Sequence, residues 1–291
     1  MFNGFSHSVK GASHESRGIV CQDSSAFKVS ESGKYAMCVV ADGHGSKKHF
    51  RSNIGSQFAV EAMVETVEKF CADSNAFDEN FPQNHKMIIK NIEKQMISVW
   101  NYKVKEHLKT NPVTDEEKSQ FTNEEFESIN PESYYGSTLI SAVIAENYCF
   151  GMQIGDGSLV AVFEDGDAVM PMVYDESAPA NITSSVCNAN AASMFNSFYV
   201  ENKKPVAFYA STDGLYTSFG SDRDFLDYHL IITAQLKDVE SFDKSVLKNL
   251  TKRSHYGTQD DISLSCVFNE DYIKSNYDEL SKKLKENTKK G

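Results

Sequence analysis

The stretch Ala36-Met37-Cys38-Val39-Val40-Ala41-Asp42-Gly43-His44-Gly45 decides how the rest of this sequence is interpreted. Its apolar first six residues have the length and β-branched content of a buried strand. The glycines that follow stop the strand in a tight turn and allow the backbone to approach a ligand closely. Asp42 and His44 therefore lie where a rigid strand opens into a loop, a frequent position for chemistry. A hard oxygen ligand beside a proton donor or acceptor suggests metal-assisted hydrolysis, and the alternative is an ordinary Asp-Gly turn.

The composition is that of a globular chain with an acidic surplus. Its 291 residues are 40% hydrophobic and 24% charged, which is enough for a sizeable core in one large domain or two small ones. The 29 basic and 41 acidic residues give a formal charge of −12. Because phosphate backbones select basic surfaces, we expect no nucleic-acid partner.

The sequence predicts neither a targeting segment nor a membrane segment. Residues 1–7 lack the basic region and apolar core of a signal peptide, and no run of about 18 apolar residues occurs. The six cysteines contain no Cys-x-x-Cys pair, so we expect reduced thiols and no zinc site in a cytoplasmic protein. They are Cys21, Cys38, Cys71, Cys149, Cys187 and Cys266.

The order of apolar patterns predicts antiparallel sheets with helices packed on them. Strands are expected over 24–30, 35–41, 137–145, 148–154, 158–164, 169–173, 206–212 and 261–268. Helices are expected over 53–70, 86–108, 225–236, 239–252 and 271–285. Hairpins dominate, which favours antiparallel pairing. No repeat or linker divides the chain, so we expect a single domain over 1–291.

Three segments differ from this pattern. Residues 110–133, called the insertion below, are acidic and poor in aliphatic side chains. We expect a solvated loop or short surface helix there, with an acidic partner-binding surface as the alternative. Residues 174–198 are polar and without period, which predicts a long surface excursion. Residues 270–291 are expected to form a charged helix and tail.

Aspartates recur at the ends of the predicted strands. They are Asp23, Asp42, Asp156, Asp213 and Asp260. Single acids at such places are usually caps or turn formers. If these five converge, their like charges repel by several kcal/mol unless a cation lies among them. Oxygen ligands without a Cys or His cluster favour Mg²⁺ or Mn²⁺ over Zn²⁺.

The ordered motifs resemble one known family. The matching segments are residues 17–23, 40–45, 135–138, 154–158, 211–215 and 259–263. Together they resemble the metal-dependent protein serine/threonine phosphatases of type 2C, and Ser13-His14 with Cys21-Gln22-Asp23 resembles the bacterial branch. The resemblance implies an α+β fold, a four-layer α-β-β-α sandwich of two antiparallel sheets flanked by helix pairs.

The resemblance also implies a centre of two Mn²⁺ or Mg²⁺ ions, with a possible weak third site. By position, Asp42 would bridge both ions, the Gly43 carbonyl would bind one, Asp213 and Asp260 would ligate the other, Asp23 would hold a water, and Asp156 with Asp213 would form the third site. Two such cations make an attacking water acidic and offset phosphoryl charge.

The leaving alkoxide needs a proton, and His44 is the best candidate general acid. The alternative is a supporting or surface histidine. No cysteine nucleophile is required.

The candidate phosphate-binding residue departs from the family pattern. Arg17, the candidate clamp for substrate phosphate, stands one residue farther from Asp23 than usual, and Gly18 occupies the usual position. A bulge could restore the contact, or His14 could replace it. Asp261 is expected to support the site rather than bind metal.

Three functions remain open at this stage. The first is an active phosphatase acting on phosphoserine or phosphothreonine in proteins. The others are a catalytically weak binding module and a phosphatase for a small phosphate ester. We expect a monomer acting on a phosphorylated protein in the cytoplasm, without membrane contact.

Overall fold

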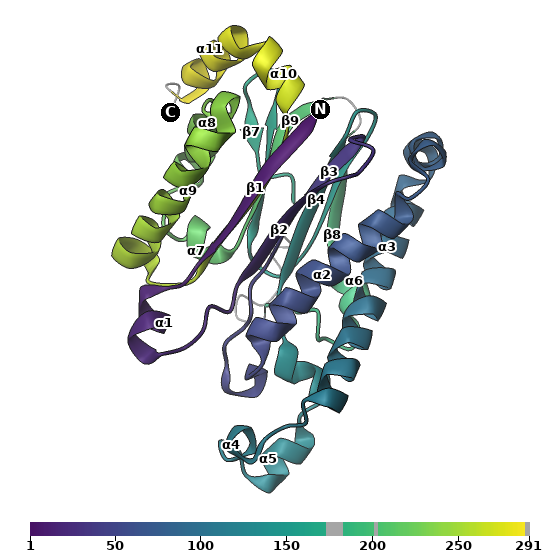
Figure 1. The fold of residues 1–291 in the computed structure, drawn as a ribbon, viewed down its shortest axis with the longest axis vertical. Coiled ribbons are helices and arrows are strands. Elements are labelled where there is room, and N and C mark those ends of the chain that lie inside the picture. Colours follow the sequence, from purple (N-terminus) through teal and green to yellow (C-terminus); the bar gives the residue numbers. More distant parts are fainter. Residues whose placement is uncertain (173–182, 201–202, 289–291) are drawn as a thin grey trace.

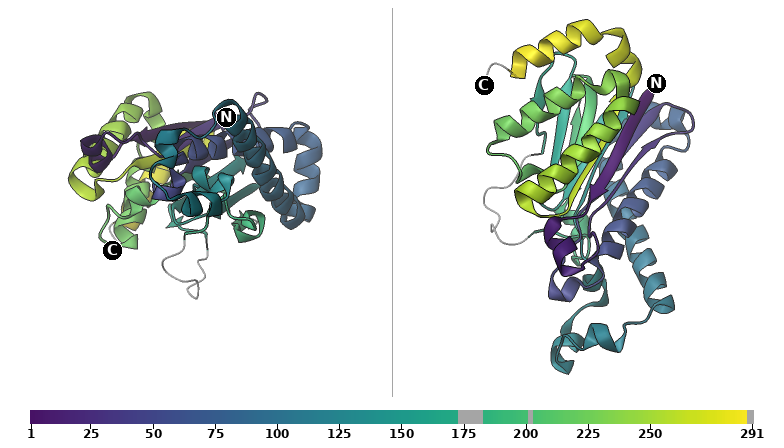
Figure 2. Two further views of the ribbon diagram at one scale, coloured as in Figure 1. Left: turned by 90° about the horizontal axis from the view of Figure 1, so that it is seen from below. Right: turned by 60° about the vertical axis from the view of Figure 1, so that its left-hand side comes forward.

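Two antiparallel sheets packed face to face form the centre of the molecule (Figures 1 and 2). The structure is a computed structural model that describes residues 1–172, 183–200 and 203–288. One sheet has the strand order β1-β10-β9-β6-β7, and the other has β2-β3-β4-β5-β8. Helices cover both outer faces. This arrangement confirms the predicted α+β sandwich of four layers.

The elements have the following bounds. The strands are β1 Phe2–Val9, β2 Ser24–Val29, β3 Tyr35–Ala41, β4 Leu139–Ala145, β5 Cys149–Ile154, β6 Ser158–Phe163, β7 Ala168–Val169, β8 Asn196–Val200, β9 Pro205–Ser211 and β10 Ile262–Asn269. The α-helices are α1 Ala12–Arg17, α2 Ser52–Phe70, α3 Ser74–Thr110, α4 Asp115–Lys118, α5 Asn123–Ser128, α6 Ala191–Met194, α7 Asp213–Tyr216, α8 Asp222–Thr233, α9 Val239–Arg253, α10 Glu270–Ser275 and α11 Tyr277–Thr288. Short turns of other helix types are η1 Lys47–His49, η2 Pro131–Tyr135, η3 Leu236–Asp238 and η4 Ser254–Thr258.

The inner core lies between the two sheets. Val40 of β3 and Ile140 of β4 meet Phe208 of β9 and Val267 of β10, all fully buried. Alternate residues of the same strands face outward and pack under helices. This burial on both faces explains why all seven residues of β3 are buried.

The helices bury their apolar faces on the outer sides of the sheets. α2 and α3 share a core with β3, β4 and β5, whereas α8, α9 and α11 share one with β9 and β10. In α9 the residues Phe242, Val246 and Leu250 recur every four positions and are buried. Trp100 of α3 donates from Nε1 to the Gly55 carbonyl at 3.0 Å, which fixes α3 on α2.

Several elements differ from the sequence-based expectation. β1 and α1 were not predicted, although β1 pairs with β10 along its whole length. α3 begins at Ser74, twelve residues before the expected 86, and carries a break at Asn84 behind Pro82. The strand expected over 169–173 is limited to β7 within the described residues. The expected terminal helix is divided into α10 and α11.

The two unusual segments have defined structure where they are described. Of the excursion expected over 174–198, residues 174–182 lie outside the described part of the chain, and the rest contains α6 and most of β8. The insertion folds into two short helices, α4 and α5, each opened by a capping box. A partner-binding role of this acidic segment stays a prediction. No helix in the described ranges is long and apolar enough to cross a membrane.

Candidate active site

The predicted aspartates gather at one end of the sandwich because the strands alternate in direction. β3, β5 and β9 end there, so Asp42, Asp156 and Asp213 each follow one of them within two residues. β2 and β10 begin there, so Asp23 and Asp260 come just before them. In Figure 1 this is the end of the sheets that lies near α1 and α7.

A single cavity of about 340 Å³ brings most of the predicted site residues together. Its walls are His14, Arg17, Ile19, Gln22, Asp42, Gly43, His44, Gly45, Asp156, Thr183, Asp213, Asp260 and Asp261. Asp23 is the one predicted site residue that is absent from these walls, since it is buried behind them. A larger groove, of about 950 Å³, lies elsewhere and contains none of the predicted site residues.

Asp42 is held in place by the start of β4. Its backbone N–H donates to the Thr138 hydroxyl at 2.9 Å, and the Thr138 N–H donates to the Asp42 carbonyl at 2.8 Å. Its carboxyl group is within hydrogen-bond reach of Asp213. Burial, followed by the charges of Asp23 and Asp213, raises the pKa of Asp42 well above its usual range.

The glycines after Asp42 allow the turn to pass close to neighbouring backbone segments. The Gly43 N–H donates to the Gln22 carbonyl at 3.2 Å. A side chain at position 43 would lie 2.8 Å from the backbone of both Gln22 and Ser52. Gly45 has a φ of +59°, a region that favours glycine. The turn that carries His44 therefore depends on both glycines.

Asp23 accepts a hydrogen bond in the interior. The Thr212 hydroxyl donates to its Oδ2 at 2.8 Å, and the same hydroxyl accepts from the Ser263 N–H at 2.9 Å. Burial raises the pKa of Asp23 to about 8, the hydroxyl of Thr212 opposes this, and the charge of Asp261 adds to it.

Asp213 and Asp156 occupy turns that follow strands. Asp213 opens α7, and its pKa is raised by burial and by the charge of Asp156. Asp156 follows Gly155, whose φ is +108°, and its Oδ2 accepts from the Thr183 hydroxyl at 2.8 Å. The cavity thus collects negative charge from both sheets.

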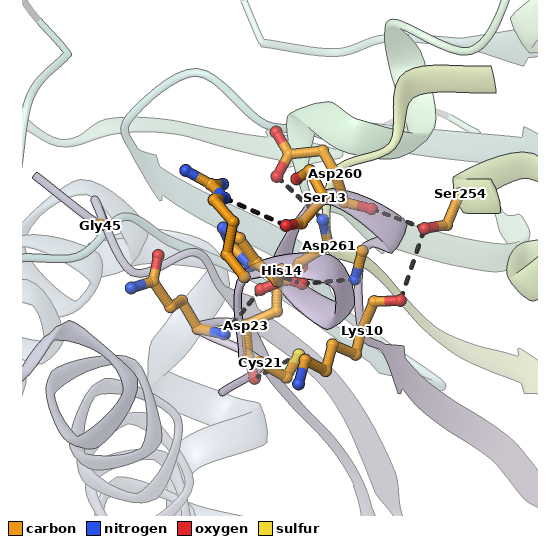
Figure 3. Close-up of polar contacts among 12 residues, drawn as sticks. Lys10, Ser13, His14, Cys21, Asp23, Gly45, Ser254, Asp260 and Asp261 are labelled. Carbon is orange, nitrogen blue, oxygen red and sulfur yellow. Dashed lines mark hydrogen bonds and ion pairs between the residues drawn. The ribbon is translucent and has the colours of Figure 1, made fainter. Parts of the chain in front are cut away.

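Asp261 fixes the start of α1 at the cavity wall. Its carboxylate accepts from the N–H groups of Gly11 and Gln22, both at 2.6 Å, and lies 3.0 Å from Nδ1 of His14. Figure 3 shows this cluster of Asp261 and His14, with Asp260 beside it. The Ser254 hydroxyl donates to the Asp260 carbonyl at 2.8 Å and so holds the strand start that bears both acids.

Arg17 reaches the cavity from the last turn of α1. Its Nε donates to the Ser13 carbonyl at 3.0 Å, and within the described residues its terminal nitrogens have no hydrogen bond. Gly18, with a φ of +68°, ends the helix after it. His14 is engaged with Asp261, so Arg17 is the better placed of the two candidates for binding phosphate.

His44 is largely buried and packs against a second histidine. Its ring lies 5.0 Å from the ring of His49, centroid to centroid, and its backbone N–H donates to the Gly136 carbonyl at 3.2 Å. Burial, then the neighbouring His49, lowers the pKa of His44 to about 4. Its Nε2 is buried and has no partner among the described residues.

Donor chemistry at this end fits a hard divalent cation. Asp42, Asp156, Asp213 and Asp260 offer only oxygen, and burial together with acidic neighbours raises the pKa of Asp42 and Asp213. In the described ranges, no three His, Cys, Asp or Glu side chains are arranged to hold an ion as they stand. The six cysteines are free, as expected.

Sequence reasoning missed some parts of the site. Thr183 and Ile19 line the cavity, but no motif marks them. His49 packs on His44, yet its sequence context is only a basic run after the glycine turn. Such contacts depend on tertiary packing, which a pattern along the chain does not contain.

Comparisons with known proteins bear on the family and the fold. The model of the family described as Protein phosphatase 2C matches residues 10–251. No curated protein matches the sequence. The chain is similar in structure to PppA, described as a key regulatory component of T6SS in Pseudomonas aeruginosa, at 17% identity and TM-score 0.56, covering 92% of this chain and 97% of that one.

Two further solved structures share the fold. Serine/threonine phosphatase Stp1 from Staphylococcus aureus is 14% identical with TM-score 0.56, and 93% of this chain and 96% of that chain are covered. The catalytic domain of serine threonine protein phosphatase PstP in complex with 2 manganese ions is 13% identical with TM-score 0.53, at coverages of 92% and 97%.

Proposed function

The chain belongs to the protein phosphatase 2C family, and from this premise we propose that it is a Mn²⁺- or Mg²⁺-dependent phosphatase that hydrolyses phosphoserine and phosphothreonine in proteins. The observation that carries the proposal is the convergence of acids, a histidine and an arginine on one cavity: Asp42, Asp156, Asp213, Asp260, His44 and Arg17.

The acids of the cavity would hold the cations. We assign Asp42 and the Gly43 carbonyl, with Asp213 and Asp260, to two ions, and Asp156 with Asp213 to a weaker third. Bound divalent cations supply an acidic water for attack on phosphorus and offset the charge of the phosphoryl group. Burial, followed by the charges of acidic neighbours, raises the pKa values of Asp42 and Asp213, and a bound cation would offset that charge.

Asp23 has a separate part in this proposal. It is buried behind the cavity and its Oδ2 accepts from Thr212. We assign its other carboxyl oxygen to orienting a water at the cavity wall, as a hydrogen-bond acceptor.

Arg17 and His44 would act on the substrate. The free terminal nitrogens of Arg17 suit two oxygens of a phosphate. Burial lowers the pKa of His44 to about 4, which favours the neutral imidazole before a substrate binds. The negative charge of a bound phosphate ester favours its protonated form, and the proton then passes to the leaving serine or threonine oxygen.

The decisive experiment measures phosphate release from p-nitrophenyl phosphate and from a panel of phosphoserine and phosphothreonine peptides. With Mn²⁺ the protein should turn over, and EDTA or Asp42→Asn should abolish turnover. Turnover that survives EDTA would exclude the proposed chemistry. Hydrolysis of free phosphate esters but of no peptide would favour a small-molecule substrate, and inactivity despite Mn²⁺ binding would favour a binding module. Action in the cytoplasm and a monomeric state stay predictions.

A further inference from the structure

The side chain of Arg51, at the start of α2, makes most of its hydrogen bonds to residues of the insertion. It is only 6% exposed. Its Nε and Nη2 donate to the two carboxylate oxygens of Glu117 at 2.7 and 2.8 Å. Nη1 donates to the Asn111 carbonyl at 2.7 Å and to the Tyr135 hydroxyl at 2.9 Å, and Nη2 donates to the Pro112 carbonyl at 3.1 Å. This guanidinium group is therefore unavailable to a substrate phosphate and serves another purpose.

Glu117 is oriented for this pairing by its own helix. The Thr114 N–H donates to Glu117 Oε2 at 2.8 Å, and the Glu117 N–H donates to the Thr114 hydroxyl at 3.2 Å, closing the capping box of α4. The Arg51 guanidinium is the main reason that the pKa of Glu117 is lowered to about 2. The pair is thus ionised over the whole range in which the protein would work.

The last residue of the insertion and the three residues after it form the wall behind His44. The Arg51 N–H donates to the Tyr134 carbonyl at 2.8 Å. His49 Nδ1 is hydrogen-bonded to the Ser133 carbonyl. A methyl group on Gly136 would overlap the His49 ring and lie 3.0 Å from Cδ2 of His44. The two histidine rings therefore pack directly on residues 133–136, which Arg51 holds against α2.

We propose that the Arg51–Glu117 pair is a positioning device for His44. It locks the insertion onto α2, and the wall at residues 133–136 then fixes where the imidazole stands in the cavity. The inference rests on the proposed function, in which His44 gives a proton to the leaving group. A positioning fault should therefore affect poor leaving groups, which need that proton, far more than p-nitrophenolate, which leaves without it.

The test compares Glu117→Gln with wild type on a phosphoserine peptide and on p-nitrophenyl phosphate, both with saturating Mn²⁺. We expect kcat on the peptide to fall roughly tenfold or more, while kcat on p-nitrophenyl phosphate and both KM values change less than about twofold. Arg51→Lys keeps the charge but loses the two-pronged geometry, so it should behave like Glu117→Gln. Glu116→Gln, on the exposed side of the same helix, is the matched control and should match wild type.

Tyr135→Phe removes one partner of Arg51 and gives a milder variant, which should show a smaller loss in the same direction. Thermal unfolding verifies that each variant is folded at the assay temperature. Equal losses on the two substrates would reduce the pair to a purely structural role, and unchanged kinetics on both would refute the inference. His44→Gln separates the two proposals: if it shows no preference for the good leaving group, the proton-donor role itself is wrong.

Discussion

Asp23 is buried with one hydroxyl partner on Oδ2, and this environment has a measurable consequence for stability. Its pKa rises from 3.8 to about 8 on folding, so the folded protein binds this proton more tightly than the unfolded chain. The contribution is favourable at low pH and is lost as the pH rises from about 4 to about 8. Cation-free wild type should therefore lose stability between pH 6 and pH 8.

The prediction is checked by thermal unfolding in EDTA at pH 6 and pH 8. Asp23→Asn cannot ionise, so its unfolding temperature should fall less over this interval than that of wild type. An equal fall in both proteins would mean that Asp23 ionises normally in the folded state.

Arg17 is one residue farther from Asp23 than the corresponding arginine of the family pattern. α1, which the sequence did not predict, places it on the cavity although it lies one position too early. We expect Arg17→Ala to raise KM for a phosphopeptide about tenfold, the effect of losing a charged hydrogen bond to phosphate. The KM of Arg17→Lys should lie between those of wild type and Arg17→Ala, because lysine keeps the positive charge but cannot make two parallel hydrogen bonds to phosphate.

Steady-state kinetics at saturating Mn²⁺ measures this, with the exposed Glu15→Gln on the same helix as the control. If Arg17→Ala left KM unchanged, a group other than Arg17 would have to bind the substrate phosphate.

At the scale of elements, the contact of α2 with η2 is the tightest constraint near the site. Alanine normally stabilises a helix interior over glycine by about 1 kcal/mol. At Gly55, however, a methyl group would overlap the Tyr135 carbonyl oxygen. Gly55→Ala should therefore destabilise the protein by roughly 1–3 kcal/mol through overpacking. Denaturant unfolding measures this, with Gly220→Ala, where a methyl group meets nothing closer than 3.6 Å, as the control.

A stabilised Gly55→Ala protein would contradict that packing. It would also weaken the argument that residues 133–136 are held rigidly against α2.

The elements that the sequence predicted are those with strong local patterns. β3 and β9 are apolar runs that end in Asp-Gly signals, and α9 repeats its buried residues every four positions. β1 was missed because Asn3, Gly4 and His7 interrupt its alternation, so that its pairing with β10 decides its structure. β8 is a short, partly exposed edge strand in a segment without period.

The candidate site was predictable only in part for a related reason. Each aspartate follows or precedes a strand that the pattern reveals, so their meeting at one end follows from antiparallel topology. The Arg51–Glu117 pair joins residues 66 positions apart, and no local sequence pattern predicts that they pair. The buried position of Asp23 likewise depends on Thr212, from the other sheet.

At the scale of the whole molecule, the two sheets bring Asp42, Asp156, Asp213 and Asp260 together in one cavity. The protein carries a formal charge of −12, and at this end Asp42 and Asp213 have raised pKa values because they are buried and because acidic neighbours surround them. A divalent cation bound there should stabilise the folded protein by linkage, since the unfolded chain offers no such site.

The most direct test of the central claim is thermal unfolding of wild type and Asp42→Asn with EDTA and with excess Mn²⁺. Mn²⁺ should raise the unfolding temperature of wild type by several degrees, which corresponds to about 2–3 kcal/mol at one hundred times the dissociation constant. Asp42→Asn should respond little, and in EDTA it should be at least as stable as wild type because one buried charge is gone. Wild type that unfolds at the same temperature with and without Mn²⁺ would contradict the claim that these aspartates form a cation site.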